Sequence, residues 1–157
     1  MAFTKLKNCL ACNSKNLRQV LDLNSQPLAN SYLKNKRIKE KKYQLKVNAC
    51  LNCSHLQLSI AVNPKKIYQN YDYVSGTTNT YKIFMKKFYK FCLKNNKKIL
   101  YRNVLDIGCN DGSQLDVFKY NKFKTFGVDP AKNIFKISSK KHKVICDFFN
   151  KDVVAKL

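Results

Sequence analysis

Two cysteine pairs of identical spacing constrain the N-terminal part of this chain more than any other feature. Cys9 and Cys12 form one Cys-x-x-Cys motif, and Cys50 and Cys53 form the other. A gap of two residues lets both thiolates of a pair point at one ion, and two pairs complete a tetrahedral shell of four sulfurs. Because such a shell has no open position, the pattern predicts a structural zinc ion that stabilises a module with little apolar core.

The distance between the two motifs leaves other interpretations open. The 37 residues that separate Cys12 from Cys50 exceed the ~15–20 that are typical of compact zinc ribbons. The cysteines could instead be unrelated buried thiols, or one pair could be redox-active. Two pairs of equal spacing favour zinc over both alternatives. His55 lies two residues after Cys53, but four thiolates already complete the shell, so we expect His55 in a strand and not as a ligand.

The sequence contains no candidate for membrane insertion or export. No apolar run approaches the ~20 residues that span a bilayer, and the first residues, MAFTKLKNCLAC, lack the apolar core of a signal peptide. We therefore expect a cytoplasmic protein without a membrane partner. In that compartment the seven cysteines are expected to be metal ligands or buried thiols and not disulfides.

The chain is strongly basic, with 31 Lys and Arg against 9 Asp and Glu and a net charge of +22. Such a charge raises the possibility of a nucleic-acid partner. The lysines are spread along the chain, however, and both Lys and Asn, which are abundant here, use A-rich codons. We therefore favour compositional drift, and a zinc-binding module that binds nucleic acid remains the alternative, which salt-dependent binding to DNA or RNA would support.

The pattern of apolar residues divides the chain into two domains. Residues 1–75 contain the strand-like runs LRQVLDL, YQLKVNA and HLQLSIAV, so we expect a β-rich zinc-binding domain there. Residues 78–100 predict an amphipathic helix, capped by Thr78 or Thr80. Its apolar face is expected to contain Ile83, Phe84, Phe88, Phe91 and Cys92. This helix leads the second domain, over residues 76–157.

From residue 102 onward the pattern alternates between strand and helix. Strands are expected at 103–107, 123–128 and 143–146, and helices at 112–120, 131–139 and from 150. Alternation of this kind is typical of a parallel, doubly wound sheet. The predicted fold class is α/β.

An aspartate lies at or just after the end of each of the three predicted strands. These residues are Asp106, Asp129 and Asp147. Gly108 and Gly112 bracket the turn after the first strand, where glycine permits positive φ and lets a ligand approach the backbone. The helix that follows offers free N–H groups at its first turn. Only DxGxxxG is present, and not the dinucleotide pattern GxGxxG.

The spacing of these acids favours one ligand class. Asp129 follows Asp106 by 23 residues, the position at which such folds bind both ribose hydroxyls. Asp147 could accept an adenine amino group, and Phe148 could stack on the ring. Helix capping is the competing explanation for Asp111 and Asp129. An adenosine with a charged amino-acid tail fits this set better than a pyrophosphate does, and S-adenosylmethionine is that ligand.

The chain resembles the zinc-containing, S-adenosylmethionine-dependent sugar C-methyltransferases. The matching stretches are CLAC, VLDLNSQPLANSYL, CLNCSHLQLSIAVNP, YQNYDYVSGTTNT, VLDIGCNDGSQL, FGVDPAKN and VICDFFNKDVVAKL. The resemblance implies a zinc-binding N-terminal domain followed by the first part of a Rossmann-like class I methyltransferase sheet. It implies zinc ligands at Cys9, Cys12, Cys50 and Cys53, and a cofactor site at Gly108, Asn110, Asp111, Gly112 and Asp129.

The resemblance also implies a chemistry and a substrate. A nucleotide-linked keto-deoxysugar loses a proton beside its keto group, and the resulting enolate carbon attacks the methyl group of the cofactor in line. Aromatic residues after the zinc module lie near the substrate in this family. Tyr71 and Tyr73 are the matching candidates, and ordinary packing is the competing role for both.

Members of this family are a couple of hundred residues longer than the segment that matches this chain, which ends at Leu157. We therefore expect a truncated or split form in which the candidates for the catalytic base are absent and residues 102–157 are marginally stable alone. A separately encoded C-terminal half would supply the remaining strands. The chain could also act as a non-catalytic partner that completes a site in trans.

Overall fold

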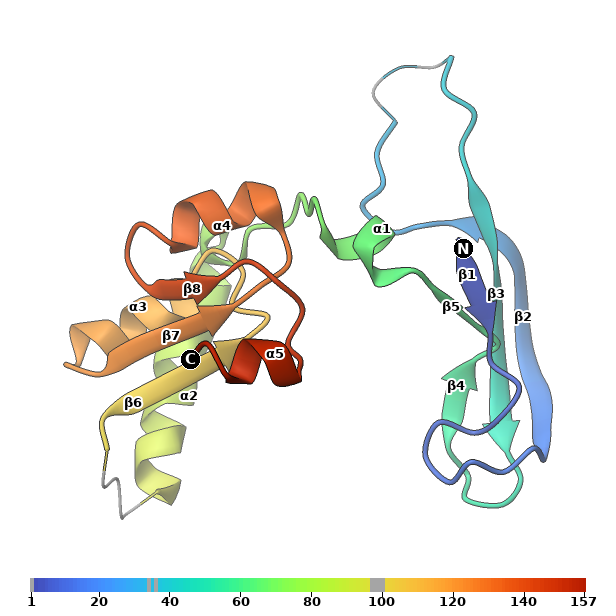
Figure 1. Cartoon of the computed structure of the whole chain (residues 1–157), viewed down its shortest axis with the longest axis horizontal. Coiled ribbons are helices and arrows are strands. Elements are labelled where there is room, and N and C mark those ends of the chain that lie inside the picture. Colours follow the sequence, from blue (N-terminus) through green and yellow to red (C-terminus); the bar gives the residue numbers. More distant parts are fainter. Residues whose placement is uncertain (1, 34, 36, 97–100) are drawn as a thin grey trace. The chain divides into compact units, whose positions relative to one another are not determined.

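The computed structural model describes residues 2–33, 35, 37–96 and 101–157. The chain forms two compact units, Met1–Ile67 and Tyr68–Leu157, which we call the N-terminal and the C-terminal unit (Figure 1). None of the helices in these described ranges is long and apolar enough to cross a membrane.

The N-terminal unit consists of antiparallel strands. Strand β2 (Leu17–Pro27) pairs with β3 (Lys42–Cys50), and β3 pairs with β4 (Leu56–Leu58). Strand β1 (Phe3–Lys5) pairs separately with β5 (Ile60–Val62), which leads into the short helix α1 (Pro64–Tyr68). The long β2–β3 hairpin occupies the interval between the two cysteine motifs, and this hairpin explains why their separation exceeds that of a compact ribbon.

Two details of the N-terminal unit differ from the sequence expectation. The run HLQLSIAV is divided at Ser59, so that its halves pair with different strands as β4 and β5. His55 precedes β4 and is not part of a strand. Its carbonyl oxygen instead accepts the backbone N–H of Cys50 at 2.8 Å, so His55 serves the second cysteine motif through its backbone.

The C-terminal unit is built on a parallel sheet in the order β6-β7-β8. The strands β6 (Asn103–Ile107), β7 (Lys124–Val128) and β8 (Lys143–Ile145) are joined through the helices α3 (Ser113–Tyr120) and α4 (Lys132–Ser138), and α5 (Lys151–Val154) follows β8 (Figure 1). This alternation confirms the predicted fold class, a β-rich unit with a cysteine cluster followed by a Rossmann-like α/β sheet.

Helix α2 (Asn79–Asn95) precedes the sheet and follows a single 3-10 turn, η1 (Ser75–Thr77). Of the two predicted caps, Thr78 is the one used, since its hydroxyl accepts the backbone N–H of Tyr81 at 3.4 Å. The helix was expected over residues 78–100. Residues 97–100 of that range lie outside the described part of the chain.

The buried face of α2 is not the predicted one. Met85 is its one buried residue, at 2% exposure, whereas four of the five expected apolar residues are 41–63% exposed: Ile83, Phe84, Phe88 and Phe91. Helix α2 packs through Met85 and Tyr89 toward α3, where Tyr89 contacts Phe118 edge-on at a centroid distance of 5.1 Å. The aromatic stripe therefore stays on the surface because no described residue covers it.

The core of the C-terminal unit lies between the sheet and its helices. Its fully buried side chains are Met85, Leu115, Val128, Ile134, Ser138 and Val153. Within the described residues β6 pairs on one side only, with β7, and Leu105 and Ile107 on this strand are 40% and 56% exposed. A hollow of about 360 Å³ lies between α2 and β6, lined mainly by apolar side chains such as Leu93 and Leu105.

Candidate functional site

The four predicted zinc ligands meet in one cluster. The Sγ atoms of Cys9, Cys12, Cys50 and Cys53 all lie within 4.8 Å of one another, and both the Cys9–Cys53 and the Cys12–Cys50 sulfur pairs are 3.6 Å apart. Four sulfurs at about 2.3 Å from a tetrahedral zinc ion are about 3.8 Å apart. The donor set and its spacing therefore fit zinc.

The two cysteine motifs have the same backbone geometry. In each, the residue after the second cysteine has a left-handed φ, 60° at Asn13 and 62° at Ser54, and its N–H binds the carbonyl of the first cysteine at 2.9 Å. The N–H of the first cysteine binds a carbonyl five residues later, that of Ser14 or of His55, at 2.8 Å. This repeated turn is what points both thiols of each motif toward the shared centre.

Side chains around the cluster support it. The amide of Gln57, which is 6% exposed, accepts the N–H of Leu10 at 2.8 Å and donates to the carbonyl of Asn8 at 3.0 Å, so it fastens the first motif to β4. The backbone N–H of Ser14, with smaller contributions from neighbouring thiols, lowers the pKa of Cys12 to about 6. A backbone hydrogen bond at His55 acts to lower the pKa of Cys53, but the neighbouring thiols, Cys12 foremost, together with burial raise it to about 12. A thiolate is the form that binds zinc, so the two shifts act in opposite directions on the cluster.

A second candidate site lies at the glycine turn after β6. Gly108 and Gly112 have φ of 81° and 80°, and Asn110 between them has φ of 49°. The N–H groups of Gly108 and Cys109 bind the carbonyl of Val128, at 2.8 and 3.3 Å, which fixes the turn to the end of β7. At Gly112 a Cβ atom would lie 2.7 Å from the ring of His142, so this position requires glycine for space as well as for φ.

Asp129 lies at the end of β7 and is 7% exposed. One carboxylate oxygen accepts the N–H of Asn110 at 2.9 Å and the other accepts the N–H of Ala131 at 2.8 Å. The residue thus joins the glycine turn to the loop before α4. A carboxylate has about four lone-pair sites, so each oxygen retains the capacity to accept one more hydrogen bond from a ligand.

Asn110 and Asp111 direct their side chains to the segment before α2. Asn110 donates from Nδ2 to the carbonyl of Tyr73 at 2.9 Å, and its Oδ1 accepts the N–H of Ser75 at 2.9 Å. The Oδ2 atom of Asp111 accepts the N–H of Gly76 at 3.0 Å, and it also accepts the hydroxyl of Ser113. Both residues are buried, so these contacts occupy side chains that the sequence assigned to a cofactor.

A pocket of about 250 Å³ opens beside the glycine turn. Its lining residues come from η1, α2, β6, the turn and α3: Ser75, Tyr81, Phe84, Met85, Phe88, Asp106, Gly108, Cys109 and Gln114. Among the described residues that line it, Asp106 is the only carboxylate, and none is a lysine or arginine. Burial, together with the nearby charge of Asp129, raises the pKa of Asp106. A cation in the pocket would relieve this unfavourable environment.

Cys109 also lines this pocket, and its Sγ lies beside Gly127, where a Cβ atom would be 2.6 Å away from it. Burial is the main cause that raises the pKa of Cys109 to about 12, with further contributions from Asp129 and Asp106. The thiol therefore stays protonated at neutral pH and packs as a small apolar group.

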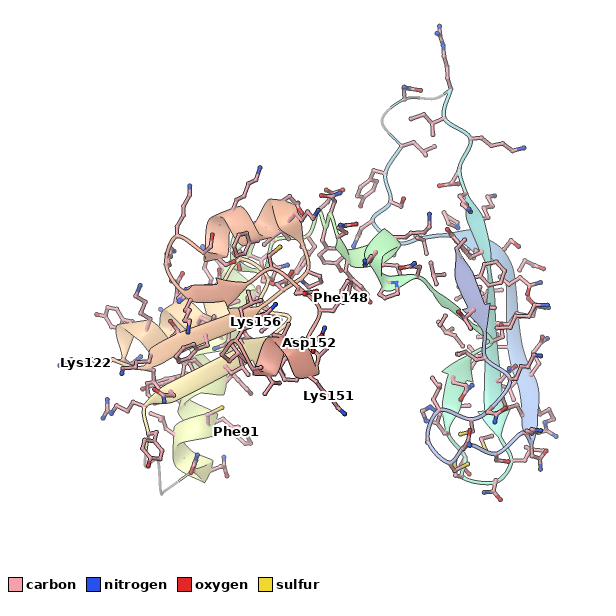
Figure 2. All side chains as sticks on the ribbon, in the orientation of Figure 1. Phe91, Lys122, Phe148, Lys151, Asp152 and Lys156 are labelled. Carbon is pink, nitrogen blue, oxygen red and sulfur yellow. The ribbon has the colours of Figure 1, made fainter. Side chains whose placement is uncertain are left out.

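The remaining predicted residues lie elsewhere. Asp147 is exposed after β8, where its Oδ1 accepts the N–H of Phe148 at 2.7 Å, and Phe148 lies in the loop before α5 (Figure 2). Neither residue lines the 250 Å³ pocket. The N–H of Tyr71 binds Asn133 Oδ1 at 3.0 Å, and Tyr73 is 46% exposed. The proposed contacts of these four residues with a ligand stay predictions.

Of the residues that line the pocket, sequence reasoning assigned only Asp106 and Gly108 to a site, and Tyr81, Phe84 and Gln114 are among those that it missed. Tyr81 stacks on Phe84 at a centroid distance of 5.7 Å, and Gln114 donates to the carbonyl of Met85 at 3.3 Å. The periodicity of α2 marked it as amphipathic. It carried no signal that the first turn of the helix faces a pocket and not a core.

Three comparisons with known proteins bear on these sites. Residues 9–68 match the family described as "Putative zinc binding domain". The chain is 25% identical over 131 residues to C-methyltransferase NovU of Streptomyces niveus, a match that covers 82% of this chain and 31% of that protein. It is also similar, with a TM-score of 0.36 and 25% identity, to a SAM-dependent methyltransferase from Archaeoglobus fulgidus, over 48% of this chain and 32% of that one.

The matched zinc-binding region contains all four cysteines of the cluster, and the C-methyltransferase match extends over most of this chain. The chain spans about a third of the length of that C-methyltransferase. On the cysteine cluster and these two matches, the chain fits a zinc-containing methyltransferase family.

Proposed function

We propose that this chain binds S-adenosylmethionine at the glycine turn and provides the cofactor-binding part of a C-methyltransferase. The observation that supports the proposal most directly is the character of the 250 Å³ pocket. In a chain of net charge +22, the part of its lining that the structure describes contains Asp106 and no basic residue. Such a pocket favours a ligand with a cationic end, and it disfavours a pyrophosphate.

Different residues at and near the turn would bind different parts of the ligand. Asp106 would accept the ammonium group of the amino-acid tail, and the open space at Gly108, where a Cβ atom would meet nothing within 4 Å, leaves the backbone accessible. The free acceptor sites of Asp129 would bind the ribose hydroxyls. When bound, the cofactor supplies an electrophilic methyl group.

The volume of the pocket is consistent with a site that encloses only part of the ligand. Pockets for drug-sized ligands are about 300–1,000 Å³, so a volume of about 250 Å³ accommodates one end of such a ligand and not the whole. The adenosine end would then extend along the carboxyl ends of the strands toward Asp147 and Phe148. These two residues are partly or largely accessible and leave room for it.

Calorimetric titration with S-adenosylhomocysteine tests the proposal. We expect wild type to bind it, and we expect Asp106→Asn and Asp129→Ala each to weaken binding at least about tenfold, which corresponds to about 1.4 kcal/mol. Asp152→Asn is the matched control, because Asp152 is an exposed carboxylate on α5 and should not change binding. Wild type that binds no S-adenosylhomocysteine, or that binds ADP equally well, would contradict the proposal.

For the second substrate we propose a nucleotide-linked keto-deoxysugar. The support is the sequence resemblance described above together with the basic surface, which attracts anionic substrates. The base that removes the proton beside the keto group is not identified among the described residues. Incubation with such a sugar and S-adenosylmethionine, followed by mass analysis for a gain of one methyl group, tests this assignment.

We also propose that β6 receives further polypeptide, either as a continuation of this chain or as a separately encoded C-terminal half. Three features support this: the side of β6 with which no described strand pairs, the exposure of Leu105 and Ile107, and the hollow beside α2. An additional parallel strand would satisfy the free backbone groups of this edge. Methyl transfer that occurs only after such a polypeptide is added would support the proposal.

A further inference from the structure

The segment Gln69–Thr77, which we call the strap, runs from the end of α1 to the start of α2 past the first turn of α4 (Figure 1). It contains no regular structure before η1, yet it is held at several points. At its first end the carbonyl of Gln69 accepts the N–H of Lys132 at 3.0 Å. Asn133 then forms a reciprocal pair with Tyr71, accepting its N–H at 3.0 Å and donating to its carbonyl at 2.8 Å.

The second end of the strap is bound by the glycine turn itself. Asn110 uses both atoms of its side-chain amide, one on Tyr73 and one on Ser75, and Asp111 accepts the N–H of Gly76. Asn110 and Asp111 are 8% and 9% exposed, so these hydrogen bonds are largely shielded from water. A buried side chain that satisfies backbone groups in this way is costly to remove.

Gly76 shows how closely the strap approaches the turn. A Cβ atom at this position would overlap Ser113 Oγ and lie 2.6 Å from Asp111 Oδ2. The φ of Gly76 is not in the left-handed region, so the position requires glycine for space alone. A side chain here requires either the strap or the side chains of Ser113 and Asp111 to move, and either movement disturbs the contact between Asp111 and the N–H of Gly76.

We propose that Asn110 and Asp111 are positioning residues: they fasten the strap that carries Tyr71 and Tyr73 to the ligand-binding turn, so that the state of the pocket and the position of these tyrosines are coupled. The side wall of the pocket at Ser75 belongs to the strap, whereas Asp106 and Gly108 belong to the turn. A ligand that contacts both sides binds the closed strap better than the released one. By linkage it stabilises the closed strap by the same free energy.

This proposal rests on the proposed function for the identity of the ligand, but not for the attachment of the strap. Chymotrypsin provides the readout, because it cleaves after Tyr71 and Tyr73 and requires local release of the segment. We expect Gly76→Ala to raise the rate of cleavage at these two sites at least about tenfold. Asn110→Gly should do the same, since glycine accepts the φ of 49° while both side-chain bonds to the strap are lost.

Ser75→Ala is the matched control in the strap. Ser75 is held through its backbone N–H, so the substitution leaves every strap contact in place and should leave the cleavage rate unchanged. Mass spectrometry assigns the cleaved bonds, and circular dichroism together with the zinc content verifies that each variant is folded. Equal cleavage of wild type, Gly76→Ala and Asn110→Gly after Tyr71 and Tyr73 would overturn the proposal.

S-Adenosylhomocysteine separates this proposal from the proposed function. We expect a saturating concentration to slow cleavage of wild type at both tyrosines, and Gly76→Ala to bind it at least about fivefold more weakly. Binding without protection, and with equal affinity in Gly76→Ala, would overturn the coupling while the proposed function stands. If wild type binds none, the proposed function fails, and the cleavage rates without ligand decide the role of Asn110 and Asp111.

Discussion

The two units of this chain stabilise their folds by different means. In the N-terminal unit the buried residues are few and include two of the four clustered cysteines, Cys9 and Cys50. Much of β2 is exposed, with Val20, Leu21 and Leu23 at 45–48%. The C-terminal unit instead buries a set of apolar side chains between its sheet and its helices, among them Leu115, Val128 and Ile134.

This difference indicates where each unit derives its stability. A module with so little apolar burial cannot offset the entropy of ordering its chain, which costs about 1–2 kcal/mol per residue for the backbone alone. We therefore expect a bound metal to provide the balance in the N-terminal unit, whereas the C-terminal unit depends on packing. Three experiments test this contrast, and they follow in order of the size of the expected effect.

Loss of the metal should unfold one unit and spare the other. Cys50→Ser removes a ligand that is 1% exposed, and we expect loss of the zinc ion and of hydrogen-exchange protection throughout β2, β3 and β4. The energy at stake is large, since structural zinc in small modules contributes about 10–16 kcal/mol. Metal analysis and exchange measured by mass spectrometry report on each unit separately.

Cys92→Ser is the control for this experiment, because Cys92 lies on α2 outside the cluster and its loss should not change the zinc content. Retention of one zinc ion per chain in Cys50→Ser would contradict the role of Cys50 as a ligand on which the N-terminal unit depends. Loss of exchange protection in β6 and β7 as well would show that the C-terminal unit depends on the metal too.

A cavity in the core of the C-terminal unit should destabilise that unit and spare the N-terminal unit, the opposite of what loss of the metal does. Leu115 is 0% exposed, so Leu115→Ala is expected to lower the free energy of unfolding of this unit by about 2–5 kcal/mol and to leave the zinc content unchanged. Phe91→Ser is its control on α2, labelled in Figure 2, because Phe91 is 63% exposed and the change should stay within about 0.5 kcal/mol. Comparable losses in both variants would mean that the aromatic stripe of α2 is covered.

The smallest effect concerns the buried histidine behind the glycine turn. His142 binds Thr125 Oγ1 through Nδ1 at 2.8 Å, and its Nε2 lies 3.2 Å from Asp116 Oδ1. Burial lowers its pKa below 6.5, and the nearby cations of Lys119 and Lys141 act in the same direction, whereas Asp116 opposes them. The folded unit therefore favours the neutral form of His142 more than the unfolded chain does.

As the pH falls through 6.5, the unfolded chain takes up a proton at His142 before the folded chain does. The free energy of unfolding therefore decreases as the pH falls below that value. We expect wild type to lose more free energy of unfolding between about pH 7.5 and 5.5 than His142→Gln does, by at most about 1.4 kcal/mol per pH unit. Chemical denaturation at both pH values measures this. Equal losses in the two proteins would exclude His142 as the cause.

The zinc cluster and the order of the elements could be predicted from the sequence because both depend on local spacing. Two residues between cysteines suffice to define a knuckle, and alternation of strand and helix suffices to define a parallel sheet. The three strands were found within one residue of their predicted bounds, for example Asn103–Ile107 against 103–107. The zinc-binding match over residues 9–68 agrees with this part of the prediction.

The buried face of α2 could not be predicted in the same way. The aromatic residues Phe84, Phe88 and Phe91 have the spacing of a core-facing stripe, yet the helix packs through Met85. Periodicity identifies an apolar face but not the elements that lie against it. Burial depends on which neighbours are present, and within the described residues α3 contacts α2 along a different line.

By itself, the sequence determined the four clustered cysteines, the strands and helices after residue 102 and the aspartates at the strand ends, since these follow from short-range pattern and from the chemistry of the side chains. Only the tertiary structure decided what Asn110 and Asp111 contact. Their partners Tyr73, Ser75 and Gly76 are 35–37 residues away in the sequence. A hydrogen bond requires two groups within about 3 Å, and for residues so distant in sequence only the folded chain determines which groups meet.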